Sequence, residues 1–371
     1  MTQQRLWDTF SSLISIDSPS YEEKNLCEEL KKRLSSLGAQ VWEDDAGTEI
    51  GGNCGNLYGF LPGELPTAPL LFSAHLDTVE PGRGKRAILG ENGTIISGGD
   101  TVLGADDVAG IAVILEALTR IKENNMPRRP IELLFPVAEE RYCKGSAVFD
   151  YSRIQAKEAY PLDLGGAIGQ AANAAPTVLS FEITVKGKAA HAGFAPGRGI
   201  HAVAAAAKAI ARIPLGEPVP GITVNIGTIG GGQAGNIVPA LCKVTGEIRS
   251  LSHEAVLEQW KTVQDIFAHE TNAVGAMLET NHRYQITAYE TPLDSAVVRR
   301  FQKACDKTGI EPSIHTTLGG SDQNHYAQNG IEGLVLACSM HDVHSTREMS
   351  NLSELEQCVA LVVALMTEET I

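Results

Sequence analysis

A histidine and an aspartate follow an apolar run near the start of the chain. The stretch FSAHLDTVEPG (72–82) places His75 and Asp77 two positions apart, where the run ends. Residues i and i+2 of a strand point to the same side, so both side chains project together. A neutral imidazole is a common zinc ligand, and a nearby carboxylate fixes its tautomer and raises its basicity. Alone the pair is a weak signal, because such pairs are more often structural.

An aspartate pair stands directly before a helical pattern in the segment GADDVAG. Aspartate is a preferred N-cap residue, and its charge suits a helix N-terminus, so a structural role accounts for one of the two carboxylates. A cap needs only one. We therefore expect Asp107 or Asp106 to cap the helix and the other, for which we favour Asp106, to point into the space beyond the sheet.

Glu139 and Glu140 directly follow another apolar segment, in FPVAEERYCKG. Like charges at the end of a buried segment repel each other and lose solvation, unless they share a cation or a proton. Adjacent side chains of an extended segment face different directions. One carboxylate is therefore placed to bind a metal while the other acts as a general base on a water molecule.

Asp163 in YPLDLGG and His344 in HDVHSTRE complete the set of acidic and imidazole side chains. Each is a weak signal alone, because a loop histidine near Ser and Thr is usually only solvated. Taken together, the residues supply one histidine and one carboxylate for each of two metals and one carboxylate to share. That is the composition of a two-metal hydrolase site.

The elements that must position these residues alternate between strand and helix. Apolar runs at 56–63, 69–77 and 131–140 predict strands, and the 108–125 segment predicts a helix. Ser20 with Glu23 three residues later forms a capping-box pattern, which predicts a surface helix that ends at Gly38. This alternation predicts an α/β fold with a largely parallel sheet, and ligand sites in such sheets lie beyond the carboxyl ends of the strands.

A different pattern begins after Pro176. The predicted order of elements there is β-α-β-β-α-β, the ferredoxin-like split unit, with the last strand at RYQITAYE (283–290). The α/β pattern returns at about Thr291, with a helix at 295–309, a strand at 332–339 and a last helix from Asn351 whose capping pattern includes Glu354. We therefore predict a discontinuous catalytic domain, 1–176 and 291–371, and an inserted domain, 177–290.

Charge and cysteine usage exclude several function classes. The 371 residues carry a formal net charge of −15, which argues against a nucleic-acid backbone or an anionic membrane as partner but suits bound cations. The seven cysteines have no paired spacing, and we expect reduced, mostly buried thiols. The N-terminus has no signal-peptide pattern and no apolar stretch reaches membrane-spanning length, so we expect a cytoplasmic protein.

The motifs together resemble those of the M20 metallopeptidases, and within them the peptidase T-like group. The resemblance covers nearly the whole chain and rests on FSAHLDTVEPG, GADDVAG, PVAEER, KGKAAHAG, GGQAGNIVP, GGSD and the final HST loop, in the family's order. It implies a zinc-peptidase-like catalytic domain interrupted by a smaller lid or dimerisation domain, and a homodimer formed through that domain. Segment 141–144 departs from the small and aliphatic residues common in the family, which leaves the shape of the substrate pocket open.

The resemblance also implies a role for each site residue. The implied metal ligands are His75 and Asp163 for one metal, Glu140 and His344 for the other, and Asp106 bridging both. Glu139 matches the general base, and Asp77 matches the residue that orients His75. His191 in KAAHAG matches a lid histidine that reaches an active site across the dimer and helps to stabilise the oxyanion.

Four further residues are candidates for substrate contact: Arg249, Asn236, Gly319 and Gly320. Arg249 could equally form an ordinary ion pair, and the two glycines could merely form a tight turn. These structural alternatives stay open at this point. The carboxylate-rich ligand set suits two Zn²⁺ ions, with Mn²⁺ or Co²⁺ as alternatives.

The function expected from the resemblance is hydrolysis of short peptides by an aminopeptidase of the tripeptidase type. The same two-metal core would serve a carboxypeptidase, a dipeptidase or an N-acyl-amino-acid deacylase. A non-catalytic ligand-binding module with the same fold is a third possibility, disfavoured because the base and every implied ligand are present. A dinucleotide-binding oxidoreductase is excluded, because no Gly-x-Gly-x-x-Gly opens a helix after the first strand.

Overall fold

The chain divides into two units in the computed structural model, which describes residues 2–368. The first unit contains the chain up to Ala174, Glu290–Thr317 and the residues from Ser321 onward. The second contains Ala175–Tyr289 and Leu318–Gly320. Within the described residues, no helix combines the length and the apolar character that a membrane span requires.

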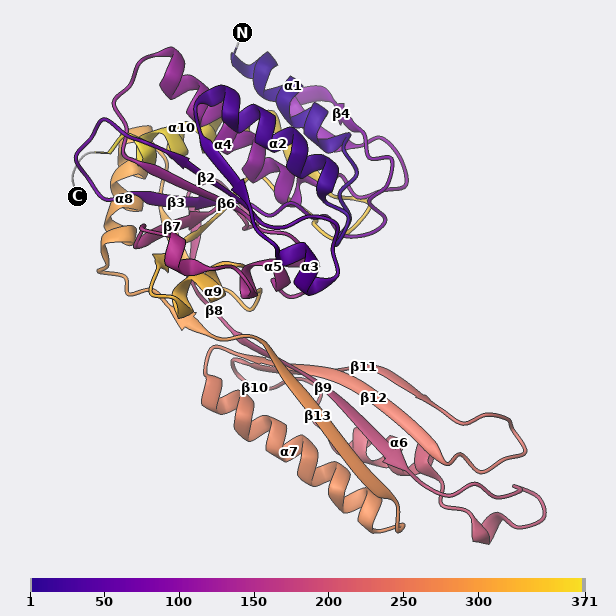
Figure 1. The fold of residues 1–371 in the computed structure, drawn as a ribbon. Helices are drawn as coiled ribbons and strands as arrows, with labels where there is room; N and C mark the ends of the chain where they lie inside the picture. Colours follow the sequence, from indigo (N-terminus) through magenta and orange to yellow (C-terminus); the bar gives the residue numbers. More distant parts are fainter. Residues whose placement is uncertain (1, 369–371) are drawn as a thin grey trace. The chain divides into compact units, whose positions relative to one another are not determined.

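A six-stranded mixed sheet forms the centre of the first unit (Figure 1). Strands β6, β3, β7 and β16 run parallel to one another. At one edge β2 pairs antiparallel with β6, and β1 pairs antiparallel with β2. In spatial order the strands are β1 (Gln40–Glu43), β2 (Leu57–Leu61), β6 (Ile131–Phe135), β3 (Leu70–Ser73), β7 (Glu158–Pro161) and β16 (Glu332–Gly333). The predicted α/β fold with a mostly parallel central sheet is confirmed.

Helices cover one face of this sheet, and shorter segments cover the other (Figure 1). Leu70 and Phe72 point into the larger core and Leu71 into the smaller one, so apolar residues fill β3 without alternation. The larger core is covered by α1 (Thr2–Ile14), α2 (Lys24–Leu37), α4 (Ala105–Glu123), α8 (Ala296–Thr308) and α10 (Leu352–Met366). The smaller core includes residues of α9 (Gln323–Gln328) and of the 149–156 segment.

Short elements complete the first unit. Two small helices, α3 (Ala46–Ile50) and α5 (Lys144–Ala147), lie in loops, as do the 3-10 helices η1 (Glu91–Gly93), η2 (Glu139–Arg141) and η3 (Tyr151–Arg153). Two small sheets consist of β14 (Tyr289–Glu290), β8 (Gln170–Ala175), β15 (Ser313–Thr316) and β17 (Val335–Leu336), and of β18 (Met349–Asn351), β5 (Thr94–Ser97) and β4 (Ala87–Leu89). The single strand predicted at 332–339 is therefore wrong, because its two halves join different sheets.

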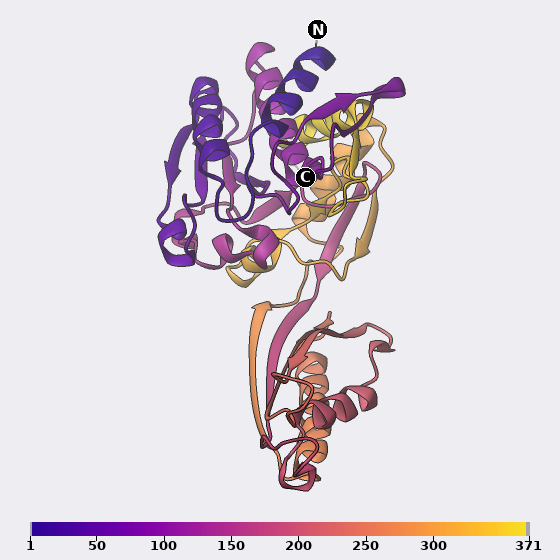
Figure 2. The same cartoon turned by 90° about the vertical axis from the view of Figure 1, so that its right-hand side faces the viewer.

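The second unit is an antiparallel sheet with both helices on one face (Figure 2). Its elements are β9 (Thr177–Lys186), η4 (Pro196–Arg198), α6 (Ala202–Arg212), β10 (Gly216–Val219), β11 (Ile222–Gly231), β12 (Leu241–Ser250), α7 (His253–Asn272) and β13 (Met277–Ile286). The strand order is β10-β11-β12-β9-β13, which is the predicted unit with one additional edge strand. The last strand starts earlier than predicted, and Tyr289–Glu290 pair in a different sheet.

The capping box predicted at Ser20 is wrong. Helix α2 starts only at Lys24, and its cap position makes no side-chain hydrogen bond. The Ser20 hydroxyl instead donates to Asp77 Oδ2 at 2.7 Å, and buried Glu23 accepts the backbone N–H of Tyr21. The side chains of Ser20 and Glu23 therefore form hydrogen bonds to polar groups near the strand ends and not to the first turn of α2. Without these bonds the polar groups would be buried without partners.

The predicted C-terminal end of α2 is confirmed, and the predicted start of α10 is confirmed only in part. Gly38 ends α2 in the left-handed conformation, with φ of 99°, as expected of a helix C-cap. Asn351 caps α10 by accepting the N–H groups of Ser353 and Glu354. The Glu354 side chain does not complete a box there, because its carboxylate lies 2.6 Å from His341 Nε2.

Candidate metal centre

His75 lies just beyond the carboxyl end of β3, almost completely buried. Its Nε2 is 2.9 Å from Asp106 Oδ1 and 3.9 Å from Asp163 Oδ1, while its Nδ1 is 3.5 Å from Asp77 Oδ1. The imidazole therefore stands between one carboxylate on one side and two on the other. An Nδ1–H facing Asp77 leaves Nε2 with its lone pair toward Asp106 and Asp163, which is the tautomer that a metal ligand requires.

The two aspartates at the start of α4 make different contacts. Asp107 is buried and accepts the N–H of Gly110 at 3.2 Å and of His75 at 3.0 Å, so it both caps the helix and holds β3. Asp106 has non-helical backbone angles and turns its carboxylate toward His75 and His344. The carboxylate left free by the cap is the one that faces the imidazoles.

The glutamate pair occupies the turn after β6, in η2. Ala138, just before it, has φ of 51°, so the chain reverses direction sharply at this point. Asp77 Oδ1 accepts the N–H of Glu139 at 2.8 Å, and Oδ2 accepts that of Glu140 at 3.2 Å. One carboxylate therefore fixes the backbone of both glutamates as well as facing His75.

The two remaining residues come from later segments of the first unit. Asp163 follows β7, and its carboxylate is mostly buried, at 15% exposure. His344 lies in the loop before β18 with φ of 60°, and its Nε2 is 3.0 Å from Glu140 Oε1 and 3.3 Å from Asp106 Oδ2. Its ring is half exposed, whereas the side chain of Glu140 is mostly buried.

Three overlapping groups result, each with ligand atoms within 4.8 Å of one another. Asp106 belongs to two of them. The groups are His75, Asp106 and Asp163; Asp106, Glu140 and His344; and His75, Glu139 and Glu140. The five residues expected to bind metal thus lie together, with Asp106 between the two sets.

The charges in this cluster are unbalanced. Burial, and then the negative charge of Asp163, raises the pKa of Glu139 well above its usual range. Burial alone would raise the pKa of Asp106, but its contacts with His344 and His75 outweigh burial and lower it. The same contact with Asp106, and then that with Glu140, raises the pKa of His344 to about 11. Glu139 therefore needs a nearby cation to be fully ionised at neutral pH.

The donor set fits two divalent cations. The groups contain four carboxylates and only two imidazoles: Asp106, Glu139, Glu140 and Asp163, and His75 and His344. Among residues 2–368 no lysine or arginine forms an ion pair with any of these four carboxylates. Buried Glu140 Oε1 makes no hydrogen bond of acceptable geometry, although His344 Nε2 is 3.0 Å away. A buried oxygen without an aligned donor is costly in a folded protein, and a metal ion is the ligand that would relieve it.

Two buried acids that support the cluster were missed in the sequence. Glu348 accepts the N–H of Gly104 at 2.7 Å and of Asp106 at 3.0 Å, so it holds the turn that presents Asp106. Asp322, in the GGSD segment, accepts a hydrogen bond from the hydroxyl of Ser146 in α5. Glu348 stands beside no second acid or histidine in the sequence, so no local pattern singles it out. Asp322 ends the quoted GGSD motif, but a role was predicted only for the two glycines of that motif.

His191 belongs to the second unit and lies in an exposed turn after β9. Its Nδ1 accepts the N–H of Gly193 at 3.1 Å and of Phe194 at 3.2 Å, and its ring packs on that of Phe194 at 4.3 Å. Because Nδ1 is an acceptor, a neutral ring carries its proton on Nε2. The turn therefore presents a fixed N–H donor, which is what an oxyanion would require.

The candidate substrate residues have different surroundings. Arg249 on β12 forms a two-pronged ion pair with Glu247 and donates to the carbonyl of Leu318 at 3.2 Å, so the structural alternative accounts for its contacts. Asn236 is exposed, and its carbonyl accepts the N–H of Ala192 at 2.9 Å, which ties its loop to the His191 turn. Gly319 and Gly320 lie in the short 318–320 segment that groups with the second unit.

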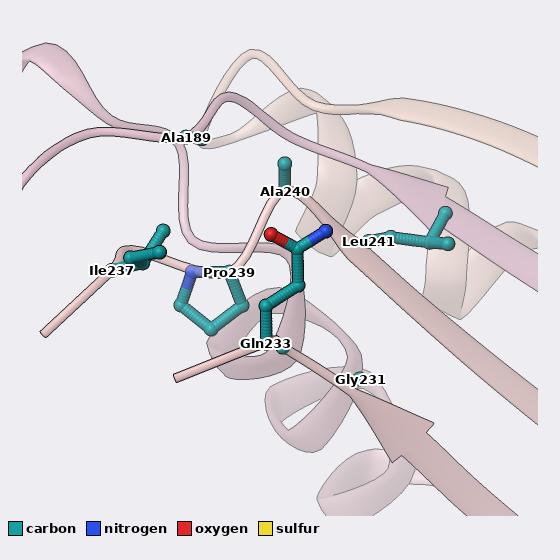
Figure 3. A pocket seen from close by; sticks show the side chains of 8 residues that line it. Ala189, Gly231, Gln233, Ile237, Pro239, Ala240 and Leu241 are labelled. Carbon is teal, nitrogen blue, oxygen red and sulfur yellow. The ribbon is translucent and has the colours of Figure 1, made fainter. Parts of the chain in front are cut away.

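A pocket of about 280 Å³ lies beside the His191 turn and the loop that carries Asn236 (Figure 3). It is lined by Ala189, Gly231, Gly232, Gln233, Ile237, Pro239, Ala240 and Leu241. No titratable side chain lines it, so it cannot supply acid–base chemistry. All its residues belong to the second unit, and it is a separate feature from the metal cluster.

Comparisons with known proteins agree with this arrangement. The crystal structure of aminopeptidase PepT from Bacillus cereus is similar, with 36% identity, coverage of 98% of both chains and a TM-score of 0.90. A tripeptidase from Staphylococcus aureus is 31% identical over 98% of both chains, with a TM-score of 0.94. The uncharacterised protein YqjE of Bacillus subtilis is 35% identical over 99% of both chains.

The chain belongs to the M20 metallopeptidase family, in its peptidase T-like group. Residues 173–274 match the model of the peptidase dimerisation domain, and residues 56–190 match that of peptidase family M28. Like other M20 members, the protein is a metal-dependent hydrolase of peptide bonds. The predicted family, fold and enzyme class are confirmed, while the role of each site residue stays a prediction.

Proposed function

We propose that this M20 enzyme is a two-metal aminopeptidase that removes the N-terminal residue of tripeptides. The position of Asp106 between two ligand groups is the observation that carries the two-metal assignment. The similar chains described as aminopeptidase PepT and as a tripeptidase support the substrate class. In this proposal His75 and Asp163 would hold one ion, Glu140 and His344 would hold the other, and Asp106 would be shared by both. Zn²⁺ suits this donor set best, with Mn²⁺ or Co²⁺ as alternatives.

When bound, the two divalent ions would supply Lewis acidity that makes a water molecule available as a nucleophile near neutral pH. Glu139 removes a proton from the attacking water and returns it to the leaving amine, a contribution of roughly 10²–10⁴-fold. Glu139 is suited to this because Asp77 fixes its backbone at 2.8 Å and burial raises its pKa. Asp77 also orients His75.

His191 donates its Nε2–H to the oxyanion that forms on the scissile carbonyl. We propose that His191 acts from the second chain of a homodimer formed through the inserted domain, 177–290. The match of residues 173–274 to a peptidase dimerisation domain supports the dimer. Light scattering of the purified protein tests it, and a mass of one chain at micromolar concentration would contradict it.

Arg249, Asn236, Gly319 and Gly320 are proposed to contact the peptide. Arg249 already pairs with Glu247 through Nε and Nη2, so its contact with substrate would use Nη1, which also reaches Leu318. Replacing Arg249 with Lys should raise KM with little change in kcat, since the guanidinium donors are lost while the charge is kept. An unchanged KM would assign Arg249 a structural role only.

A panel of short peptides tests the proposed specificity. Hydrolysis of a free tripeptide, the N-acetylated tripeptide, the C-amidated tripeptide and the corresponding dipeptide should be compared at equal concentration. An aminopeptidase loses activity when the amino terminus is blocked and keeps it when the carboxyl terminus is amidated. Activity only on the N-acetylated compounds would indicate a deacylase, and loss on amidation alone would indicate a carboxypeptidase.

A further inference from the structure

A second group of metal-binding side chains lies in the first unit, outside the predicted dinuclear site. It consists of Cys27 on α2, Glu43 on β1 and Cys54 in the loop before β2, with one ligand atom of each within 4.8 Å of the others. We propose that these three residues bind a thiophilic divalent cation such as Zn²⁺ or Cd²⁺. This site is independent of the two ions required for peptide hydrolysis.

The donor types fit such a cation. Thiolates and carboxylates are common zinc ligands, with Zn–S and Zn–O bonds of about 2.3 and 2.1 Å. Bonds of that length require the three ligand atoms to lie within a few ångströms of one another, as they do here. Both thiols are buried, at 0% and 5% exposure. Glu43 is only partly buried, and it provides the side from which an ion can enter. Hard cations such as Mg²⁺ prefer all-oxygen sites, so the thiols select against them.

A divalent ion would offset most of the negative charge of the group. Lys31 lies one turn after Cys27 on α2, and its ammonium group contacts Glu43 and also Glu28, at 2.7 Å from the latter. With both thiols ionised, the two cysteines, Glu43 and Glu28 carry four negative charges, and a divalent ion with Lys31 carries three positive ones.

The loop that carries Cys54 is held rigidly, so its thiol is positioned before any ion binds. Asp44 Oδ1 accepts the N–H of Ala46 at 3.0 Å and of Asn56 at 2.7 Å. Glu43 Oε1 accepts the N–H of Gly55 at 2.9 Å, which links the carboxylate ligand to the residue after Cys54. At Gly47 a Cβ atom would stand 2.3 Å from the Cys54 carbonyl oxygen, so only glycine permits this close approach.

Both cysteine-bearing segments also hold the turn that carries the paired glutamates. Glu23, one turn before Cys27, accepts the N–H of Ala138 at 3.0 Å. Asn56, two residues after Cys54, accepts the N–H of Val137 at 3.1 Å and donates to the carbonyl of Gly145 at 2.9 Å. An ion that joins Cys27 to Cys54 therefore fixes the two supports of this turn relative to each other, and it should raise the thermal stability of the enzyme.

Titration of the full-length, metal-loaded enzyme with Cd²⁺ tests the proposal through a readout other than activity. Thiolate-to-cadmium charge-transfer absorption in the ultraviolet should grow to saturation at one further equivalent of Cd²⁺, with a rise in Tm. Cys27→Ala and Cys54→Ala should each abolish the band. Glu43→Gln, which keeps both thiols, should retain it with affinity lowered by about 10-fold or more.

Cys358→Ala is the matched control, because Cys358 and Cys338 form the other close thiol pair, with sulfurs 3.7 Å apart. The control should titrate like the unchanged enzyme. A band that persists in Cys27→Ala, or that vanishes in Cys358→Ala instead, would overturn the site. So would a mass two hydrogens lower without bound metal, which would indicate a Cys27–Cys54 disulfide. None of these outcomes depends on peptide hydrolysis, so the proposed function is tested separately.

Discussion

Asp77 connects the two sides of the predicted metal centre. Its carboxylate faces His75 Nδ1 at 3.5 Å and accepts the backbone N–H groups of Glu139 and Glu140. It also accepts the hydroxyl proton of Ser20 at 2.7 Å. A single buried side chain therefore faces the proposed metal ligand and holds the backbone of the proposed general base, because a carboxylate offers about four lone pairs.

At the same scale, His191→Ala tests whether the fixed Nε2–H donor acts on the transition state. Loss of one oxyanion donor lowers kcat by roughly 10²–10³-fold, with little change in KM, since the donor acts mainly on developing charge. The measurement is steady-state hydrolysis of a tripeptide, with metal content as a check. His269→Ala, at an exposed histidine of α7, is the control and should leave kcat unchanged. Equal kcat in both variants would remove His191 from the mechanism.

At the scale of elements, the packing of α4 against β3 positions Asp106. Gly110 stands where a Cβ atom would meet Asp107 Oδ1 at 2.5 Å, Ala74 Cβ at 2.9 Å and Leu162 Cβ at 3.0 Å. The helix can approach the strand end this closely only because residue 110 has no side chain. The close approach brings the aspartate pair next to His75.

Gly110→Ala should therefore destabilise the enzyme despite the better helix propensity of alanine. Overpacking of this kind lowers the free energy of unfolding by about 1–3 kcal/mol, against a propensity gain of up to about 1 kcal/mol. Urea denaturation measures the difference. Gly99→Ala, at a site with open space around it, should change stability by less than about 0.5 kcal/mol. A Gly110→Ala variant as stable as this control would contradict the close packing.

The sequence predicted which segments bring the site residues together, but not the hydrogen bonds that support them. The strand ends after apolar runs predicted that His75 and Glu140 would lie near one another, because strand ends meet at one edge of a sheet. Asp106 was expected in the same space because a helix cap needs only one of the two aspartates. The supports of the site were not predictable. Glu23 fitted a capping box in sequence, yet it holds Ala138 across more than a hundred residues. Long-range hydrogen bonds of this kind leave no local pattern, and the early start of β13 was missed for a similar reason, since strand pairing extends it.

At the scale of the whole molecule, buried carboxylates make the metal-free protein sensitive to pH. Burial raises the pKa of Glu23, Glu348 and Asp322 to about 7, from usual values of 4.5 for Glu and 3.8 for Asp. Between those values the folded state binds more protons than the unfolded state. Stability from these groups is therefore fully present below about pH 4 and is lost as pH rises through about 7.

The Tm of chelator-treated protein should accordingly fall by several degrees between about pH 5 and about pH 8, since 1 kcal/mol corresponds to about 2–4 °C in a protein of this size class. Differential scanning calorimetry provides the measurement. Glu23→Gln should make the decrease smaller, and returning divalent metal at about pH 8 should raise Tm by mass action. A metal-free Tm that increases over this range would show that these carboxylates are ionised in the fold.

The central claim is that Glu139 is the base of a two-metal peptidase, and one comparison tests it most directly. Metal content and tripeptide hydrolysis should be measured together for the unchanged enzyme and for Glu139→Gln. We predict two divalent ions per chain in both proteins and a turnover lowered by roughly 10²–10⁴-fold in the variant. A Glu139→Gln enzyme that binds both ions and hydrolyses the tripeptide at the original rate would contradict the account.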